Sequence, residues 1–91
     1  MNRARLEASL RETFGPEPGS LRVVVRQAMD LAESGQYADD TGTELTVAEL
    51  VEHLGDAPDE RLVDRWNWWV GSLELAYGGY AEFEVRRWQA E

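Results

Sequence analysis

The first apolar pattern along the chain is a narrow helical stripe near its start. Leu6, Leu10 and Phe14 recur every four residues, which places them on one face of a helix. A glycine and a proline follow at once, and both residue types end helices. The spacing therefore predicts a helix over Asn2–Phe14, followed by a turn over residues 15–19.

A second apolar stripe predicts a longer helix over Leu21–Ser34. Ser20 precedes this segment and is a favourable N-cap, while Gly35 follows it at the position where helices commonly end. The run Val23–Val25 is β-branched and is also compatible with a strand. The helical spacing extends over more of the segment and favours a helix. The residues that share the apolar face are Leu21, Val24, Val25, Ala28, Leu31 and Ala32.

Residues 36–44 are polar and rich in Asp, Thr and Gly, so they predict a loop, followed by a short extended piece at Thr43–Leu45. Thr46 and Glu49 then have the spacing of a capping box, in which the Thr hydroxyl and the Glu carboxylate each accept a backbone N–H. This pattern predicts a third helix that starts at Thr46, ends at Leu54 and is followed by a Gly-Asp-Ala-Pro turn.

The longest apolar stripe predicts a fourth helix over Asp59–Tyr77, ended by two glycines. Its inward face carries Leu62, Trp66, Trp69, Val70, Leu73 and Tyr77. Beyond the glycines, hydrophobic and polar residues alternate over Tyr80–Trp88, which is the pattern of a half-buried strand. We therefore expect a single α+β domain over residues 1–91, mainly helical, with about four helices and a C-terminal strand.

The charge pattern indicates the solvent in which the protein works. All nine basic residues are arginine, against eighteen Asp and Glu residues, and the formal net charge is −9. In molar salt the Debye length is about 3 Å, so crowded carboxylates barely repel one another. The composition resembles that of small acidic proteins from salt-in halophilic archaea, which implies adaptation to high salt. The alternative explanation is a GC-rich genome, which replaces lysine with arginine.

Several absences limit the cellular setting. The chain has no cysteine, no apolar stretch long enough to span a membrane and no apolar leader after its first residues. The expectation is a cytoplasmic protein without membrane attachment.

No combination of residues predicts an enzyme, a metal site or a cofactor. His53 is the only histidine and follows Glu49 by one helical turn, but no third or fourth ligand accompanies the pair. Asp39 and Asp40 lack the spacing of a calcium loop, so we interpret them as a solvated turn. The protein is therefore expected to be non-catalytic.

Aromatic residues gather towards the end of the chain, where seven of the nine lie between Trp66 and Trp88. Trp68 lies off the inward stripe of the predicted fourth helix, with Leu75 two turns further along and Arg61 beside them. An exposed Trp–Leu pair next to an arginine has the composition of a binding hot spot. We expect Trp68, Leu75, Arg61 and Trp88 to bind a protein partner or a second copy of the chain. The alternative is that the first helix covers Trp68 and Leu75 within the monomer.

The order of elements supports a second hypothesis. A helix, a short extended piece, a capped helix, a tight turn, a longer helix and a strand together resemble a winged helix-turn-helix domain. That resemblance implies a DNA-binding transcriptional regulator whose fourth helix enters the major groove, with Arg61 and Arg65 as DNA contacts. The net charge of −9 favours protein binding over DNA binding. A third class, an acidic decoy whose carboxylates imitate nucleic-acid phosphate, fits the same charge.

Overall fold

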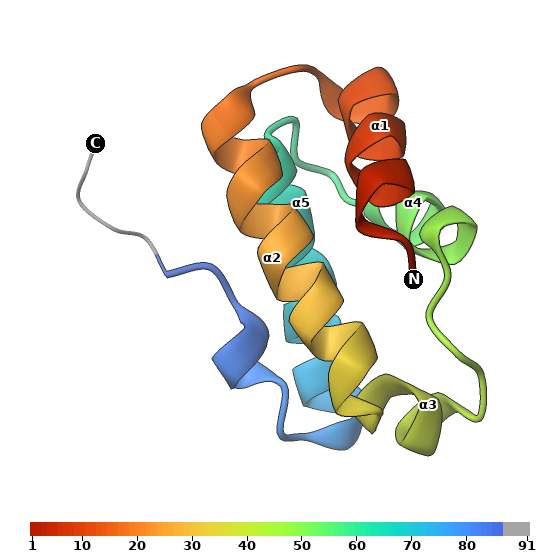
Figure 1. Ribbon diagram of the computed structural model, residues 1–91. Helices are drawn as coiled ribbons and strands as arrows, with labels where there is room; N and C mark the ends of the chain where they lie inside the picture. The colour runs from red at the N-terminus through yellow and green to blue at the C-terminus, as the bar shows by residue number, and fades with distance from the viewer. Residues whose placement is uncertain (87–91) are drawn as a thin grey trace.

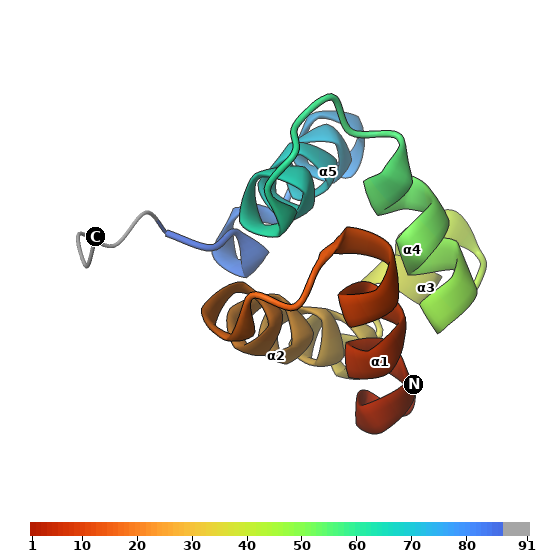
Figure 2. The ribbon, with the colours of Figure 1, turned by 90° about the horizontal axis from the view of Figure 1, so that it is seen from above.

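The computed structural model describes residues 1–86, which form five α-helices and one 3-10 turn. The elements are α1 (Arg3–Phe14), α2 (Pro18–Ser34), α3 (Gln36–Thr41), α4 (Val47–Gly55), α5 (Leu62–Tyr77) and the turn η1 (Ala81–Phe83). In sequence around a ring, α1 packs on α2, α2 on α5, α5 on α4 and α4 on α1 (Figure 1, Figure 2). The short helix α3 packs on α2 and leads towards α4. None of the described helices is long and apolar enough to cross a membrane.

The core fills the inside of this ring. Its largest fully buried side chains are Trp66, Tyr80, Leu6, Leu10, Leu31, Leu50, Leu54, Val24 and Val70. Within residues 1–86 no polar or charged residue falls in the buried class, so the acidic residues lie at or near the surface. The predicted stripe of the first helix is confirmed at Leu6 and Leu10, and Phe14 packs partly buried against the same core.

The second helix begins earlier than predicted. Its first residue is Pro18, and its N-cap is Glu17 instead of Ser20. Pro18 suits the first helical position because it has no N–H there to leave unpaired. The Glu17 carboxylate accepts the Ser20 N–H at 2.7 Å, and this bonding lowers the pKa of Glu17. The run Val23–Val25 lies inside α2, so the helical alternative for it is confirmed.

A helix occupies part of the segment that was predicted to be a loop. The helix α3 spans only six residues between Gly35 and Gly42, which adopt φ values of 76° and 80°. These left-handed conformations are readily adopted by glycine, and they let the chain turn before and after one short helix. Only Tyr37 is buried within α3, so no apolar stripe marks this helix in the sequence.

The starts of α4 and α5 differ in how well the sequence predicted them. Thr46 caps α4 as predicted, since its hydroxyl accepts the Glu49 N–H at 3.1 Å. The fourth predicted helix begins at Leu62 and not at Asp59, with Arg61 as its N-cap. Its inward face is confirmed at the five positions from Leu62 to Leu73, but Tyr77 is 49 % exposed.

The predicted C-terminal strand is wrong, and so is the α+β class, because residues 1–86 contain helices and no strand. The backbone groups of this segment are bonded by side chains and by bonds within the 3-10 turn, and not by a neighbouring strand. Trp66 Nε1 donates to the Phe83 carbonyl oxygen at 2.8 Å, and the Asn67 side chain bonds both main-chain groups of Val85. The alternation did identify buried residues, since Phe83 and Val85 lie in the core. Without a strand to form a wing, the described chain is not a winged helix.

Candidate functional site

The most unusual sequence feature of α5 is the run Trp66-Asn67-Trp68-Trp69. Successive residues of an α-helix point about 100° apart, so the four side chains leave the helix in different directions. Trp66, Asn67 and Trp69 make internal contacts, whereas Trp68 lies at the surface.

The first two residues of the run hold the segment after η1 against α5. Trp66 is fully buried, and its indole N–H bonds the Phe83 carbonyl. Asn67 Oδ1 accepts the Val85 N–H at 2.8 Å, and Asn67 Nδ2 donates to the Val85 carbonyl at 3.0 Å. From α2, Gln27 Nε2 donates to the Glu84 carbonyl at 3.3 Å. These bonds replace the backbone ladder that a strand would have needed.

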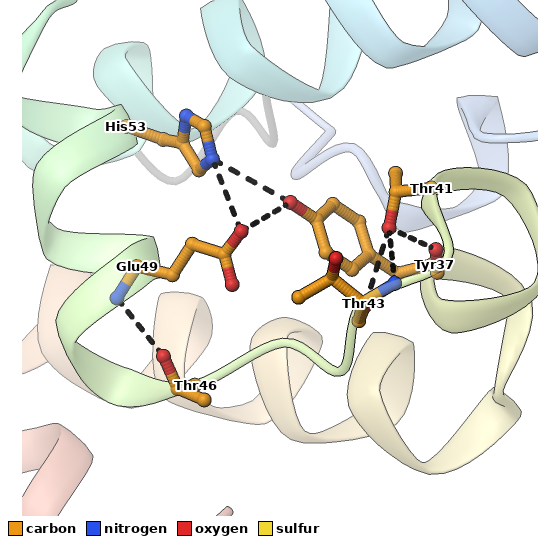
Figure 3. Close-up of polar contacts among 6 residues, drawn as sticks. All are labelled: Tyr37, Thr41, Thr43, Thr46, Glu49 and His53. Carbon is orange, nitrogen blue, oxygen red and sulfur yellow. Dashed lines mark hydrogen bonds and ion pairs between the residues drawn. The ribbon is translucent and has the colours of Figure 1, made fainter.

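The last residue of the run, Trp69, lies in a cluster with α3 and α4. Its ring stacks on His53 at 5.4 Å between ring centroids, with an angle of 16° between the planes, and lies 5.8 Å from the ring of Tyr37. The Tyr37 hydroxyl donates to Glu49 Oε2 at 3.2 Å and lies 3.5 Å from His53 Nε2 (Figure 3). Burial and the Glu49 carboxylate raise the pKa of Tyr37 to about 12.

This cluster explains why the Glu49 side chain does not bond back to the start of α4. The predicted capping box required the Glu49 carboxylate to bond back to the start of α4, but the carboxylate bonds the Tyr37 hydroxyl instead (Figure 3). His53 Nε2 and Glu49 Oε2 lie 3.9 Å apart. No group of three or more His, Cys, Asp and Glu side chains that could hold a metal occurs within residues 1–86. We interpret the cluster as a structural joint between α3, α4 and α5.

A second anchor joins α3 to the start of η1. The Tyr80 hydroxyl donates to Asp40 Oδ2 at 2.7 Å, and burial raises the pKa of Tyr80. Glu74 Oε1 accepts the N–H groups of Tyr80 and Ala81, at 2.7 and 3.1 Å. The sequence pattern does not indicate these contacts, because it predicts a solvated turn at Asp40 and a strand at Tyr80.

Trp68 and Leu75 remain at the surface. Trp68 is 41 % exposed and Leu75 is 89 % exposed. The alternative in which the first helix covers them is wrong, because α1 packs mainly on α2 and α4. Arg61 is exposed at the start of the same helix, seven residues before Trp68. The structure therefore places Trp68 and Leu75 on one side of α5 and leaves Arg61 exposed at the N-cap of this helix, whereas Trp88 lies outside the described residues.

Arg65 has a role inside the fold. Its Nη1 donates to the Leu54 carbonyl at 2.9 Å and to the Ala57 carbonyl at 3.4 Å, so it binds the main chain at the end of α4. The guanidinium also lies 4.9 Å from the centre of the Phe14 ring. Arg65 is thus occupied by internal contacts and is poorly placed for the predicted role of a DNA contact.

The fold and the aromatic run together define an all-helical domain organised around a tryptophan-rich helix. The family model of the WNWW domain matches residues 1–74, and the chain carries the four letters of that description at residues 66–69. The chain therefore belongs to the WNWW domain family. No curated protein and no solved structure matches it.

Proposed function

We propose that this domain is a non-catalytic interaction module that binds a protein partner through one face of α5. This face, called the α5 face below, consists of Trp68, Gly71, Ser72 and Leu75, and Arg61 is exposed at the N-cap of the same helix. One observation carries the proposal. Of the four residues that spell the family description, Trp66, Asn67 and Trp69 serve the fold, whereas Trp68 is exposed.

The chemistry of the α5 face supports protein binding. Tryptophan and arginine are the residues most enriched among those that dominate binding energy, and an exposed leucine beside them extends the apolar contact. Single exposed apolar residues are common, but Trp68 and Leu75 lie two helical turns apart on the same side of α5. A partner that covers both residues would remove their apolar surface from water.

The proposal is tested by comparing proteins captured from a lysate of the source organism by the tagged wild-type domain and by variants. Trp68→Ala is the test variant. Tyr77→Ala is the matched control, because Tyr77 is a half-exposed aromatic residue nine positions further on, about 180° around the helix. We expect Trp68→Ala to lose a protein that Tyr77→Ala retains. Equal capture by all three proteins, with circular dichroism showing each to be folded, would overturn the proposal.

Adaptation to high salt and a cytoplasmic location are part of this proposal. They are supported by the net charge of −9, the absence of lysine and the absence of cysteine. If carboxylate repulsion opposes folding, the urea midpoint should rise between about 0.1 M and about 2 M KCl, where the Debye length falls from about 10 Å towards 3 Å. A comparison with sodium sulfate at equal ionic strength separates screening from general salting-out, because screening is then matched and sulfate salts out more strongly. A midpoint that does not change with KCl would favour the GC-rich explanation for the composition.

A further inference from the structure

A small pocket lies between the end of α2, the start of α3 and the segment that precedes α4 (Figure 1). Its volume is about 120 Å³. Sites for small molecules and cofactors usually measure about 300–1,000 Å³, so this pocket suits a single side chain better than a metabolite. All of its lining residues lie between residues 1 and 45, so it is separate from the α5 face.

Apolar side chains form one part of the pocket lining. The chain has two methionines, and both of them, Met1 and Met29, line the pocket together with Ala32 and the buried Leu45. A methionine side chain is unbranched and has three rotatable bonds, so it adapts to the shape of the group that it contacts. These residues therefore offer contact to an aliphatic chain.

Two carboxylates form the other part of the lining. Glu33 and Glu44 both line the pocket, and both residues are exposed. Within residues 1–86 the only ion pairs lie inside α1 and inside α4, so neither carboxylate is paired with a cation of this part of the chain. Glu33 also lies in the last turn of α2, where the helix dipole is negative and no basic residue occurs. The pocket thus combines an apolar contact with an uncompensated negative charge.

The wider surface around the pocket has the same sign of charge. Residues 27–60, which include the end of α2, α3 and α4, contain ten Asp and Glu residues and no Lys or Arg. The rest of the chain carries all nine arginines and the other eight acidic residues, so the net charge of −9 arises in this one segment. A surface with one sign of charge attracts groups of the opposite sign and raises the rate at which they arrive.

We propose that the pocket binds one lysine or arginine side chain from a basic segment of a partner protein. Both side chains combine an aliphatic stem with a charged end, and they bury the stem while the charge stays near water. The stem packs against Met29 and Leu45. The charged end meets the carboxylates of Glu33 and Glu44. This inference goes beyond the proposed function, because it assigns a second contact surface on other helices.

A pocket for one side chain predicts weak binding. We expect a peptide with a single basic residue to bind with a dissociation constant of about 1 mM or weaker. Each exposed carboxylate should contribute about fivefold at most to that affinity. A partner reaches higher affinity only by adding further contacts on the acidic surface around the pocket.

Methyl NMR of the two methionines tests the site directly, because both residues line this pocket. The full chain is titrated in about 0.1 M KCl with a blocked peptide that has one arginine between glycines. The same peptide with citrulline in place of arginine is the control, because citrulline keeps the stem and lacks the charge. We expect the arginine peptide to shift both methyl signals and the citrulline peptide to bind about three- to tenfold more weakly. Equal binding of the two peptides would overturn the role of the carboxylates.

Variants separate the pocket from the acidic surface as a whole. Glu33→Gln and Glu44→Gln should each weaken binding of the arginine peptide by about two- to fivefold. Glu52→Gln is the matched control, because Glu52 is an exposed carboxylate of α4 that does not line the pocket, and the effect should stay below about twofold. Ala38→Leu keeps every charge and enlarges a side chain of the lining, so it should weaken binding as much as either glutamine variant.

Three results would overturn the site, provided that circular dichroism shows each variant to be folded. An equal loss in Glu52→Gln would mean that the peptide binds the acidic surface at large. Methyl signals that do not move at about ten times the expected dissociation constant would mean that the pocket takes no basic side chain. Methyl shifts that follow protein concentration without peptide would assign the pocket to a second copy. Trp68→Ala should bind the peptide as the wild type does, so the two contact surfaces are tested independently.

Discussion

The inward and outward faces of α5 use tryptophan in different ways. Trp66 and Trp69 are buried and contact η1, α3 and α4, whereas Trp68 between them is 41 % exposed. The three indoles lie within one turn of helix, so their difference comes from direction alone. The comparison shows that residue composition does not separate the core of this domain from its surface, whereas helical period does.

The largest expected effect is on the inward face. Trp66→Ala removes a fully buried indole and the donor to the Phe83 carbonyl. Large-to-small substitutions of this kind destabilise proteins by about 3–5 kcal/mol, a large part of the total for a small domain. Urea denaturation followed by circular dichroism should show a partly or wholly unfolded variant. A loss below about 1 kcal/mol, the range of ordinary surface changes, would contradict the core role of Trp66.

Asn67 should have the next largest effect, because it bonds both main-chain groups of Val85. Asn67→Leu leaves those groups without their partner, at a cost of about 1–3 kcal/mol. Amide hydrogen exchange at Val85 should accelerate more than exchange in α2. Asn67→Asp is the comparison variant, because it retains an acceptor for the Val85 N–H but replaces the donor with a carboxylate oxygen that faces the Val85 carbonyl. Unchanged exchange at Val85 in Asn67→Leu would show that the clamp does not hold this segment.

How well the sequence predicted the fold depended on whether a segment repeats its apolar residues. The stripes of α1, α2 and α5 each bury two or more residues at helical spacing, and the predicted segments agree with these helices except at their starts. In contrast, α3 buries only Tyr37 and gives no period. The residues after Tyr80 alternate as a strand does, but their backbone groups are bonded by side chains from α2 and α5 and by the 3-10 turn itself. Alternation records which side chains are buried, and it cannot record what bonds the backbone.

In the candidate site, too, the apolar period predicted some features and not others. The exposure of Trp68 and Leu75 followed from their angle to the inward stripe. The Tyr37–Glu49–His53 contacts did not follow, because Tyr37 lies in a segment with no predicted structure. Arg65 also could not be assigned, since its partners are carbonyl groups whose positions depend on how α4 ends.

A smaller effect on stability is expected from Tyr37, in the cluster against which Trp69 packs. This effect is confined to alkaline pH. Because the pKa of Tyr37 is raised to about 12, the folded state holds the phenol proton more tightly than the unfolded chain does, whose pKa is about 10. The stabilisation is complete below about pH 10 and is lost as the pH rises through 12. The free energy of unfolding should fall over this window, and Tyr37→Phe should reduce the slope. Tyr80, whose pKa is also raised, contributes to the same fall, so Tyr37→Phe is best compared in a Tyr80→Phe background.

The smallest effect on stability is expected at Leu75, on the outward face. Leu75 is 89 % exposed, so Leu75→Ala removes side-chain atoms that already contact water in the monomer. Both residues are good helix formers, and the free energy of unfolding should change by no more than about 0.5 kcal/mol. The measurement is urea denaturation at low protein concentration and low salt, where the monomer dominates. A loss above about 1 kcal/mol would mean that Leu75 is buried in the free monomer. In that case the two faces of α5 would not differ in exposure at this position, and Leu75 would not be available for a partner to cover.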